Sequence, residues 1–166
     1  TDDDGLINGL ITAARESAEL FLNRKLIQTT VKEYYPSYFI TELFGESLRL
    51  SLSPIISVDL IQYVDKDAVT QTLSDTLYQT DLVSEPSHIY KAYEQTLPDV
   101  LTGTVNPIVV TYKVGYGDAA TAVPLSIKNA MLLMIRDLYD HRDNPVREKM
   151  NTAAINLLAK FRVKTY

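Results

Sequence analysis

The chain opens with apolar residues repeated at helical spacing. Residues 2–25 place an apolar side chain every three or four positions, the period of an α-helix with one buried face. The members of this stripe are Ile7, Leu10, Ile11, Ala14, Ala18, Phe21 and Leu22. Three consecutive aspartates at 2–4 suit the positive N-terminal end of a helix, and Arg24 and Lys25 suit its negative C-terminal end. We therefore predict a helix over residues 2–25.

The period changes from helical to alternating in the middle of the chain. Leu48, Leu50 and Leu52 alternate with polar residues up to Pro54, which is typical of a half-buried strand. Similar β-rich runs recur across residues 27–115, namely "IQTTVKEYY", "ISVDLIQYV", "HIYKAYE" and "PIVVTYKVG". No helical segment separates these five to seven strands, so a mainly antiparallel sheet is expected.

Helical spacing returns after Pro124, a residue that the first turn of a helix tolerates. The helix predicted over 124–141 carries one apolar stripe, made of Ile127, Ala130, Met131, Met134, Ile135 and Leu138. A last helix is predicted over 151–162, because Asn151 or Thr152 can cap it and an apolar stripe follows.

The order of these elements is helix, sheet, helix, helix, which predicts an α+β fold in one domain of 166 residues. The N-terminal helix and the two C-terminal helices should form a small helical body. The β-rich segment 27–115 should then be an insertion in that body.

Composition excludes several kinds of chemistry. The chain has no cysteine, so it has no disulfide, thiolate nucleophile or cysteine-ligated zinc, and only His88 and His141 could supply imidazole ligands. The net charge of −5 is unevenly distributed: residues 1–122 carry 17 acidic and 8 basic side chains, whereas residues 123–166 carry 4 and 8. Such asymmetry either orients a protein toward a partner or a second copy, or reflects two ordinary solvated faces.

The segment "YKVGYGDAATAVP" at 112–124 contains two apparent motifs. Its "VGYGD" is close to a potassium-channel filter, but no apolar run approaches the roughly 20 residues that a spanning helix needs, so no membrane association is expected. The spacing of Gly115, Gly117 and Ala120 is that of a dinucleotide loop, yet no helix opens directly after it and no strand follows. We interpret Gly115, Gly117 and Pro124 as a structural turn where a strand leaves the sheet.

No catalytic motif is found. The cluster "YDHRDN" groups Asp140, His141, Arg142 and Asp143, but consecutive residues of a helix point in different directions. We expect His141 and Arg142 to interact with the helix end and with Asp137 or Asp140. The sequence therefore predicts no enzyme, no cofactor and no metal site.

Four segments in order resemble the head-to-tail connector (adaptor) family of tailed bacteriophages. They are "AARESAELFLNRKLI", "LRLSLSPIISVDLIQYVDKDAVTQTL", "IVVTYKVGYGDAATAVPLSIKNAMLLMIRDLYDHRD" and "INLLAKFR", and together they span nearly the whole chain. The third is the most specific, because a strand enters a Gly-Tyr-Gly turn and then a Val-Pro helix.

The resemblance implies a structural subunit of the virion neck, assembled in the host cytoplasm. Such subunits form a ring, commonly of twelve copies, beneath the portal protein, and offer a platform for a stopper or tail protein. Duplex DNA would pass through the ring without sequence-specific binding. The acidic balance of residues 1–122 leads us to expect a channel surface that is not basic, since a basic one would grip DNA.

The resemblance also implies that the C-terminal region docks on the portal. The candidate residues are Lys160, Phe161, Arg162, Lys164 and Tyr166. A frayed tail is the alternative for this segment. For the whole chain, the alternatives are another neck protein, such as a stopper or tail-completion protein, and a nucleotide-binding enzyme.

Overall fold

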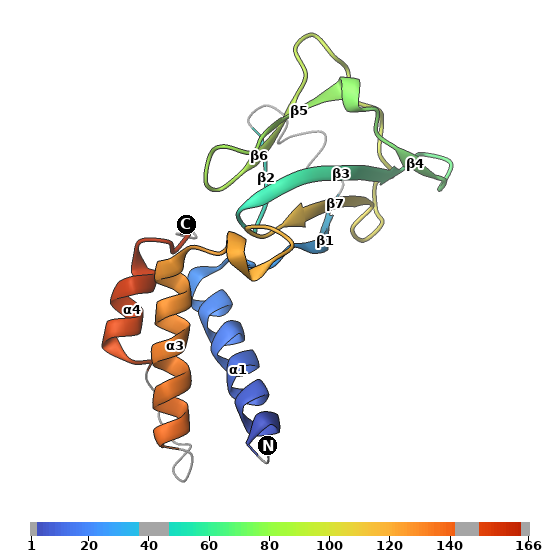
Figure 1. Ribbon diagram of the computed structural model, residues 1–166. Coiled ribbons are helices and arrows are strands. Elements are labelled where there is room, and N and C mark those ends of the chain that lie inside the picture. The colour runs from blue at the N-terminus through green and yellow to red at the C-terminus, as the bar shows by residue number, and fades with distance from the viewer. Residues whose placement is uncertain (1–2, 37–46, 142–149, 164–166) are drawn as a thin grey trace. The chain divides into compact units, whose positions relative to one another are not determined.

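The computed structural model describes residues 3–36, 47–141 and 150–163. The chain divides into two compact units (Figure 1). Residues 1–27 and 116–166 form one, called here the helical unit, and residues 28–115 form the other, called the β unit. The α+β fold class predicted from the sequence is confirmed.

The helical unit joins the two ends of the chain around one core, as predicted. Its helices are α1 (Asp4–Leu22), α3 (Leu125–Asp140) and α4 (Thr152–Ala159), and a short 3-10 helix, η3 (Ala120–Ala122), precedes α3. Both α1 and α4 pack against α3. The fully buried side chains are small or aliphatic: Ala14, Ala18, Leu22, Ile127, Ala130, Ala154 and Leu158. Among the helices of the described ranges, none is both long and apolar enough for a bilayer crossing.

Helix α1 is shorter than predicted at its C-terminal end. Asn23 adopts the left-handed conformation with φ of 52°, and the amides of Asn23 and Arg24 donate to the carbonyls of Leu20 and Glu19. This pattern of hydrogen bonds ends a helix. Arg24 and Lys25 therefore lie beyond the helix, and the dipole role predicted for them gives way to the contacts described below.

The β unit contains two antiparallel sheets. Its strands are β1 (Thr29–Tyr35), β2 (Leu48–Arg49), β3 (Ile55–Val64), β4 (Thr70–Thr72), β5 (Tyr78–Asp81), β6 (His88–Lys91) and β7 (Ile108–Val114), with a 3-10 helix η2 (Asp75–Leu77) before β5. The larger sheet has the order β1-β7-β3-β4 and the smaller one β2-β6-β5. In β7, buried Ile108, Val110, Tyr112 and Val114 alternate with less buried residues. This period-two pattern was readable from the sequence because one face of β7 forms the core.

Glu33 forms a polar cluster within the β unit. Its carboxylate accepts hydrogen bonds from the hydroxyl of Tyr35 and from the amide of Ser51 at 3.2 Å. The Tyr112 hydroxyl is also buried and lies near the same carboxylate. Burial, and then Glu33, raises the pKa of Tyr35 and of Tyr112. The cluster ties β1 to the segment that follows β2.

Two aspartates close turns in the β unit. The Asp65 carboxylate accepts from the side chain of Gln71 at 2.8 Å and from the amide of Val69 at 2.9 Å, and Asp81 accepts from the amides of Val83 and Ser84 at 3.0 Å each. Hydrogen bonding from Gln71 and then Val69 holds the pKa of Asp65 below its ordinary 3.8. Hydrogen bonding from Ser84, side chain first and then backbone, lowers the pKa of Asp81 in the same way.

We expect both turns to loosen in acid. A pKa that is lower in the folded than in the unfolded state contributes stability above the unfolded value, and this contribution is lost as pH falls through the folded value. Lowering the pH from about 5 to about 2 should therefore shift the NMR resonances of the Val69 and Val83 amides. In Asp65→Asn, the Val69 amide should lose this acid transition while that of Val83 keeps it. Unchanged Val69 behaviour in the variant would contradict the assignment.

Candidate functional site: the glycine turn and the C-terminal segment

The glycine turn, residues 115–117, has a backbone that requires glycine at two positions. Gly115 has φ of 130° and donates its amide to the Pro54 carbonyl at 2.8 Å, and Gly117 has φ of 156°. Between them, Tyr116 donates its amide to the Leu26 carbonyl at 3.2 Å. A Cβ atom placed on Gly117 would lie 2.8 Å from the Cβ of Ala122, closer than side chains approach each other. The backbone of the turn at Gly117 therefore lies directly against Ala122 of the 3-10 helix η3.

Pro124 lies directly before the first residue of α3. Its φ is −53°, and its carbonyl accepts from the amides of Ile127 at 3.0 Å and Lys128 at 3.2 Å. Val123, on its N-terminal side, is buried in the core of the helical unit. The three residues that the sequence suggested for a turn thus occupy the path from the end of β7 to the start of α3.

The C-terminal segment folds back against the end of α1. Arg24 is only 7% exposed, and its Nε atom donates to the carbonyl of Phe161. The amide of Val163 donates to the Leu22 carbonyl at 3.0 Å, and the Val163 side chain is buried. As far as Val163, the last described residue, the predicted docking segment is therefore packed rather than frayed. Sequence reasoning did not identify Arg24 as its anchor.

Two of the predicted docking residues present cations beside aromatic rings. The Lys160 ammonium lies 5.5 Å from the centroid of the Phe161 ring, and the Arg162 guanidinium lies 5.1 Å from that of Phe21. Lys160 and Arg162 are exposed, whereas Phe161 is half-buried and packs against the core. We call Lys160 and Arg162, with these two rings, the C-terminal patch. Lys164 and Tyr166 lie outside the described residues.

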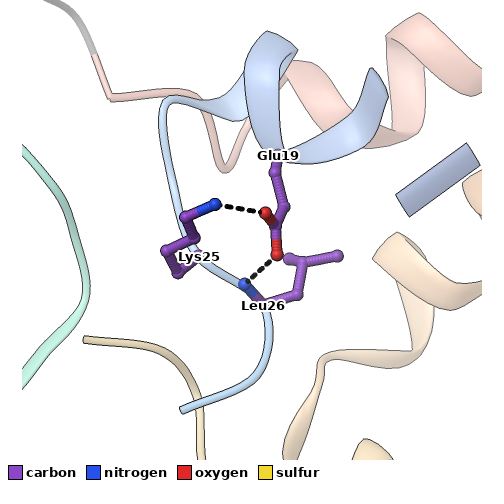
Figure 2. A network of polar contacts seen from close by, with 3 residues as sticks. All are labelled: Glu19, Lys25 and Leu26. Atoms are coloured by element: carbon purple, nitrogen blue, oxygen red, sulfur yellow. Dashed lines mark hydrogen bonds and ion pairs between the residues drawn. The ribbon is translucent and has the colours of Figure 1, made fainter. Parts of the chain in front are cut away.

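Glu19 fixes the loop between α1 and the β unit (Figure 2). Its carboxylate accepts from the Lys25 ammonium at 2.8 Å and from the Leu26 amide at 3.1 Å. The Glu19 side chain is 14% exposed, so the ion pair is shielded from solvent on one side. Lys25 therefore has a carboxylate partner, whereas the ion pairs seen among the described residues include neither Lys160 nor Arg162.

One arrangement in the β unit has the residue types of a hydrolytic triad. The Ser47 hydroxyl lies 2.8 Å from Nδ1 of His88, and Asp81 is opposite His88 in the β5–β6 pairing. However, the hydrogen bonds of Asp81 go to the backbone amides of its own turn, so it does not orient the imidazole as a triad requires. His88 also stacks on Tyr90, with ring centroids 6.0 Å apart. The geometry is that of a structural contact.

The cluster around His141 is structural too. Nδ1 of His141 lies 2.8 Å from the Asp137 carbonyl and 3.5 Å from its carboxylate, which confirms the predicted contact with the helix end. Arg142 and Asp143 lie outside the described residues. Within the described ranges, no group of three acidic or histidine side chains is arranged to hold a metal ion.

The fold occurs in solved structures. Neither protein-family models nor curated sequences give a match. A chain in the virion of a native gene transfer agent (GTA) particle superposes with a TM-score of 0.79 at 18% identity, over 99% of this chain and 80% of that one.

Two neck structures match as well. For the neck of the native GTA particle computed with C12 symmetry, the TM-score is 0.76 at 18% identity, covering 98% of this chain and 85% of that one. For the neck of the empty GTA particle computed with C6 symmetry, it is 0.76 at 19% identity, covering 98% and 80%. This protein therefore has the fold of a chain found in particle necks.

Proposed function

We propose that this protein is a structural subunit of the neck of a phage-like particle and that it carries out no reaction. The observation that supports this best is the match of 98% of the chain to neck structures, because it includes both units of the fold.

The specific role that we propose is that of the head-to-tail adaptor. Copies of the chain would form a ring under the portal protein, extend the DNA channel and receive the next neck or tail protein. Twelvefold and sixfold symmetry in the matching neck structures is what a closed ring of identical subunits produces. A stopper or tail-completion protein is the alternative within the neck, and it differs from an adaptor in not meeting the portal.

Duplex DNA would traverse this ring without being held. DNA carries one negative charge per roughly 1.7 Å, so a channel retains it mainly through basic side chains. The subunit has 21 acidic and 16 basic residues, and the acidic excess lies before residue 123. Strong duplex binding by the purified protein at moderate salt would contradict this part of the proposal.

The C-terminal patch is our candidate for contact with the portal. We expect Lys160→Glu combined with Arg162→Glu to weaken binding to the cognate portal protein by roughly tenfold to a hundredfold, since each reversal turns an attraction into a repulsion. Surface plasmon resonance at two salt concentrations would measure it. Deletion of residues 160–166 is less suitable, because Phe161 and Val163 also hold the helical unit together.

A matched control reverses two exposed cations of the β unit, Lys32→Glu with Lys91→Glu. It changes the net charge by the same amount, so it should leave portal binding within about threefold if the contact is local. Equal weakening by both double variants would show that only net charge matters. Portal binding that neither variant changes would place the docking surface elsewhere, and no binding by the wild type would favour the stopper or tail-completion role.

A further inference from the structure

Two helix faces of the helical unit expose leucines. On α1, the residues Leu6, Gly9, Ala13, Glu16 and Leu20 recur at helical spacing on the side opposite the buried stripe, and Leu6 and Leu20 are 40% and 85% exposed. We call this the α1 outer face. On α3, the α3 outer face consists of Leu125, Lys128, Leu132 and Arg136, and its two leucines are 68% and 62% exposed.

The spacing of these leucines distinguishes them from scattered surface residues. Leu125 and Leu132 are seven positions apart, as are Leu6 and Ala13, and Ala13 and Leu20. Seven residues are two helical turns, about 10.5 Å, and this repeat brings the same face of a helix against a neighbouring helix. Each of α1 and α3 thus has a second stripe besides the one that it buries within its own chain.

The two faces carry opposite charge. Glu16 is the charged residue of the α1 outer face, and Lys128 and Arg136 are those of the α3 outer face. Lys128 also donates to the Ala120 carbonyl at 3.4 Å, and Arg136 lies 3.5 Å from the carboxylate of Asp140. Both contacts are at the surface, where such interactions contribute little and leave the cations able to meet another acid.

The α1 outer face also has room for leucine side chains. A Cβ atom placed on Gly9 would meet no atom within 4 Å, so the surface of the helix is recessed and open at that position. Burying exposed leucines against one another removes apolar surface from water, so a leucine-lined contact is stabilising even with few hydrogen bonds.

We propose that the α1 outer face of one copy packs against the α3 outer face of the next copy. Because the two faces are unlike, the contact leaves a free α1 face at one end and a free α3 face at the other. Such a head-to-tail contact repeats from copy to copy, and it closes as a ring when the rotation between neighbouring copies divides the full circle evenly. This inference rests on the proposed neck function, and it names the surfaces through which the identical subunits would meet.

Cysteine cross-linking tests the contact without background, because the chain has no cysteine of its own. Single variants Ala13→Cys and Leu132→Cys would be mixed in equal amounts and treated with a short bis-maleimide. We expect the mixed dimer to exceed either homodimer roughly tenfold, which corresponds to about 1.4 kcal/mol of preference. The double variant Ala13→Cys/Leu132→Cys should give a ladder that ends at a closed ring. Circular dichroism would verify that each variant is folded.

Val83→Cys serves as the matched control, since Val83 is 94% exposed but belongs to the β unit. Its mixtures with Leu132→Cys should give dimers in statistical proportion. Statistical proportions for Ala13→Cys with Leu132→Cys would overturn the inference. Rings that electron microscopy shows around the portal would then leave the proposed function intact. Specific cross-links without any closed ring on the portal would instead support the contact and count against the adaptor role.

Discussion

Gly117→Ala should destabilise the protein by about 2–5 kcal/mol, with two separable causes. The first is the backbone, because a φ of 156° is a conformation that residues with a side chain rarely adopt. The second is packing, because the new methyl group would lie 2.8 Å from the Cβ of Ala122. Urea denaturation would measure the loss as a lower unfolding midpoint at unchanged slope.

Two further variants separate these causes. Gly103 also has a positive φ, 79°, but nothing lies within 4 Å of a Cβ placed there. Gly103→Ala should therefore cost only the backbone contribution, about 1–2 kcal/mol. Adding Ala122→Gly to Gly117→Ala should recover the packing contribution and leave the backbone one. If Gly117→Ala proved no worse than Gly103→Ala, the close approach to η3 would be of no consequence.

Much of the fold was predictable because each element has one buried face. Ala14, Ala18 and Leu22 are spaced by four in α1, and Ile108, Val110 and Tyr112 by two in β7, and all six are buried. These periods identify helix and strand directly. The helix ends were less predictable, because α1 stops at a left-handed asparagine where glycine is the common signal.

The pairing of the strands was beyond the reach of local patterns. β7 lies between β1 and β3, although more than 70 residues separate it from β1 in the sequence. Nothing in the β1 segment indicates that β7 is its partner. Strand pairing depends on which faces of the assembled sheet become buried, and this is not a local property of one strand. The separation into two sheets was likewise not readable from the alternation of leucines before Pro54.

The candidate site was predicted in part. Lys160 and Arg162 were recognised as cations near the C-terminus, but their aromatic partners were not, because Phe21 comes from the far end of the sequence. Arg24 looked like a helix-end cation and is instead buried. Arg24 lies between the apolar residues Leu22 and Leu26, and this position was the available indication that its side chain is buried. Its hydrogen-bond partner could not be inferred, because that partner depends on where the fold places Phe161.

Arg24→Ala should destabilise the helical unit by about 2–4 kcal/mol. The guanidinium is buried and donates to the Phe161 carbonyl, so its removal takes away a charge-assisted hydrogen bond, leaves that carbonyl without this donor and empties the space of the side-chain stem. Arg24→Met keeps most of the stem and should recover the packing part. Arg15→Ala removes an exposed arginine of α1 and should change stability by less than about 0.5 kcal/mol.

The same variants test whether Arg24 holds the C-terminal segment in place. Trypsin cleaves after Lys160 and Arg162 only when the local backbone is accessible, so Arg24→Ala and Arg24→Met should both accelerate cleavage there, while Arg15→Ala should not. If the C-terminal patch contacts the portal as proposed, Arg24→Met should also weaken portal binding although the patch residues are unchanged, because the patch depends on this backbone. Wild-type stability and cleavage in Arg24→Met would show that the segment is held by Val163 and the core alone.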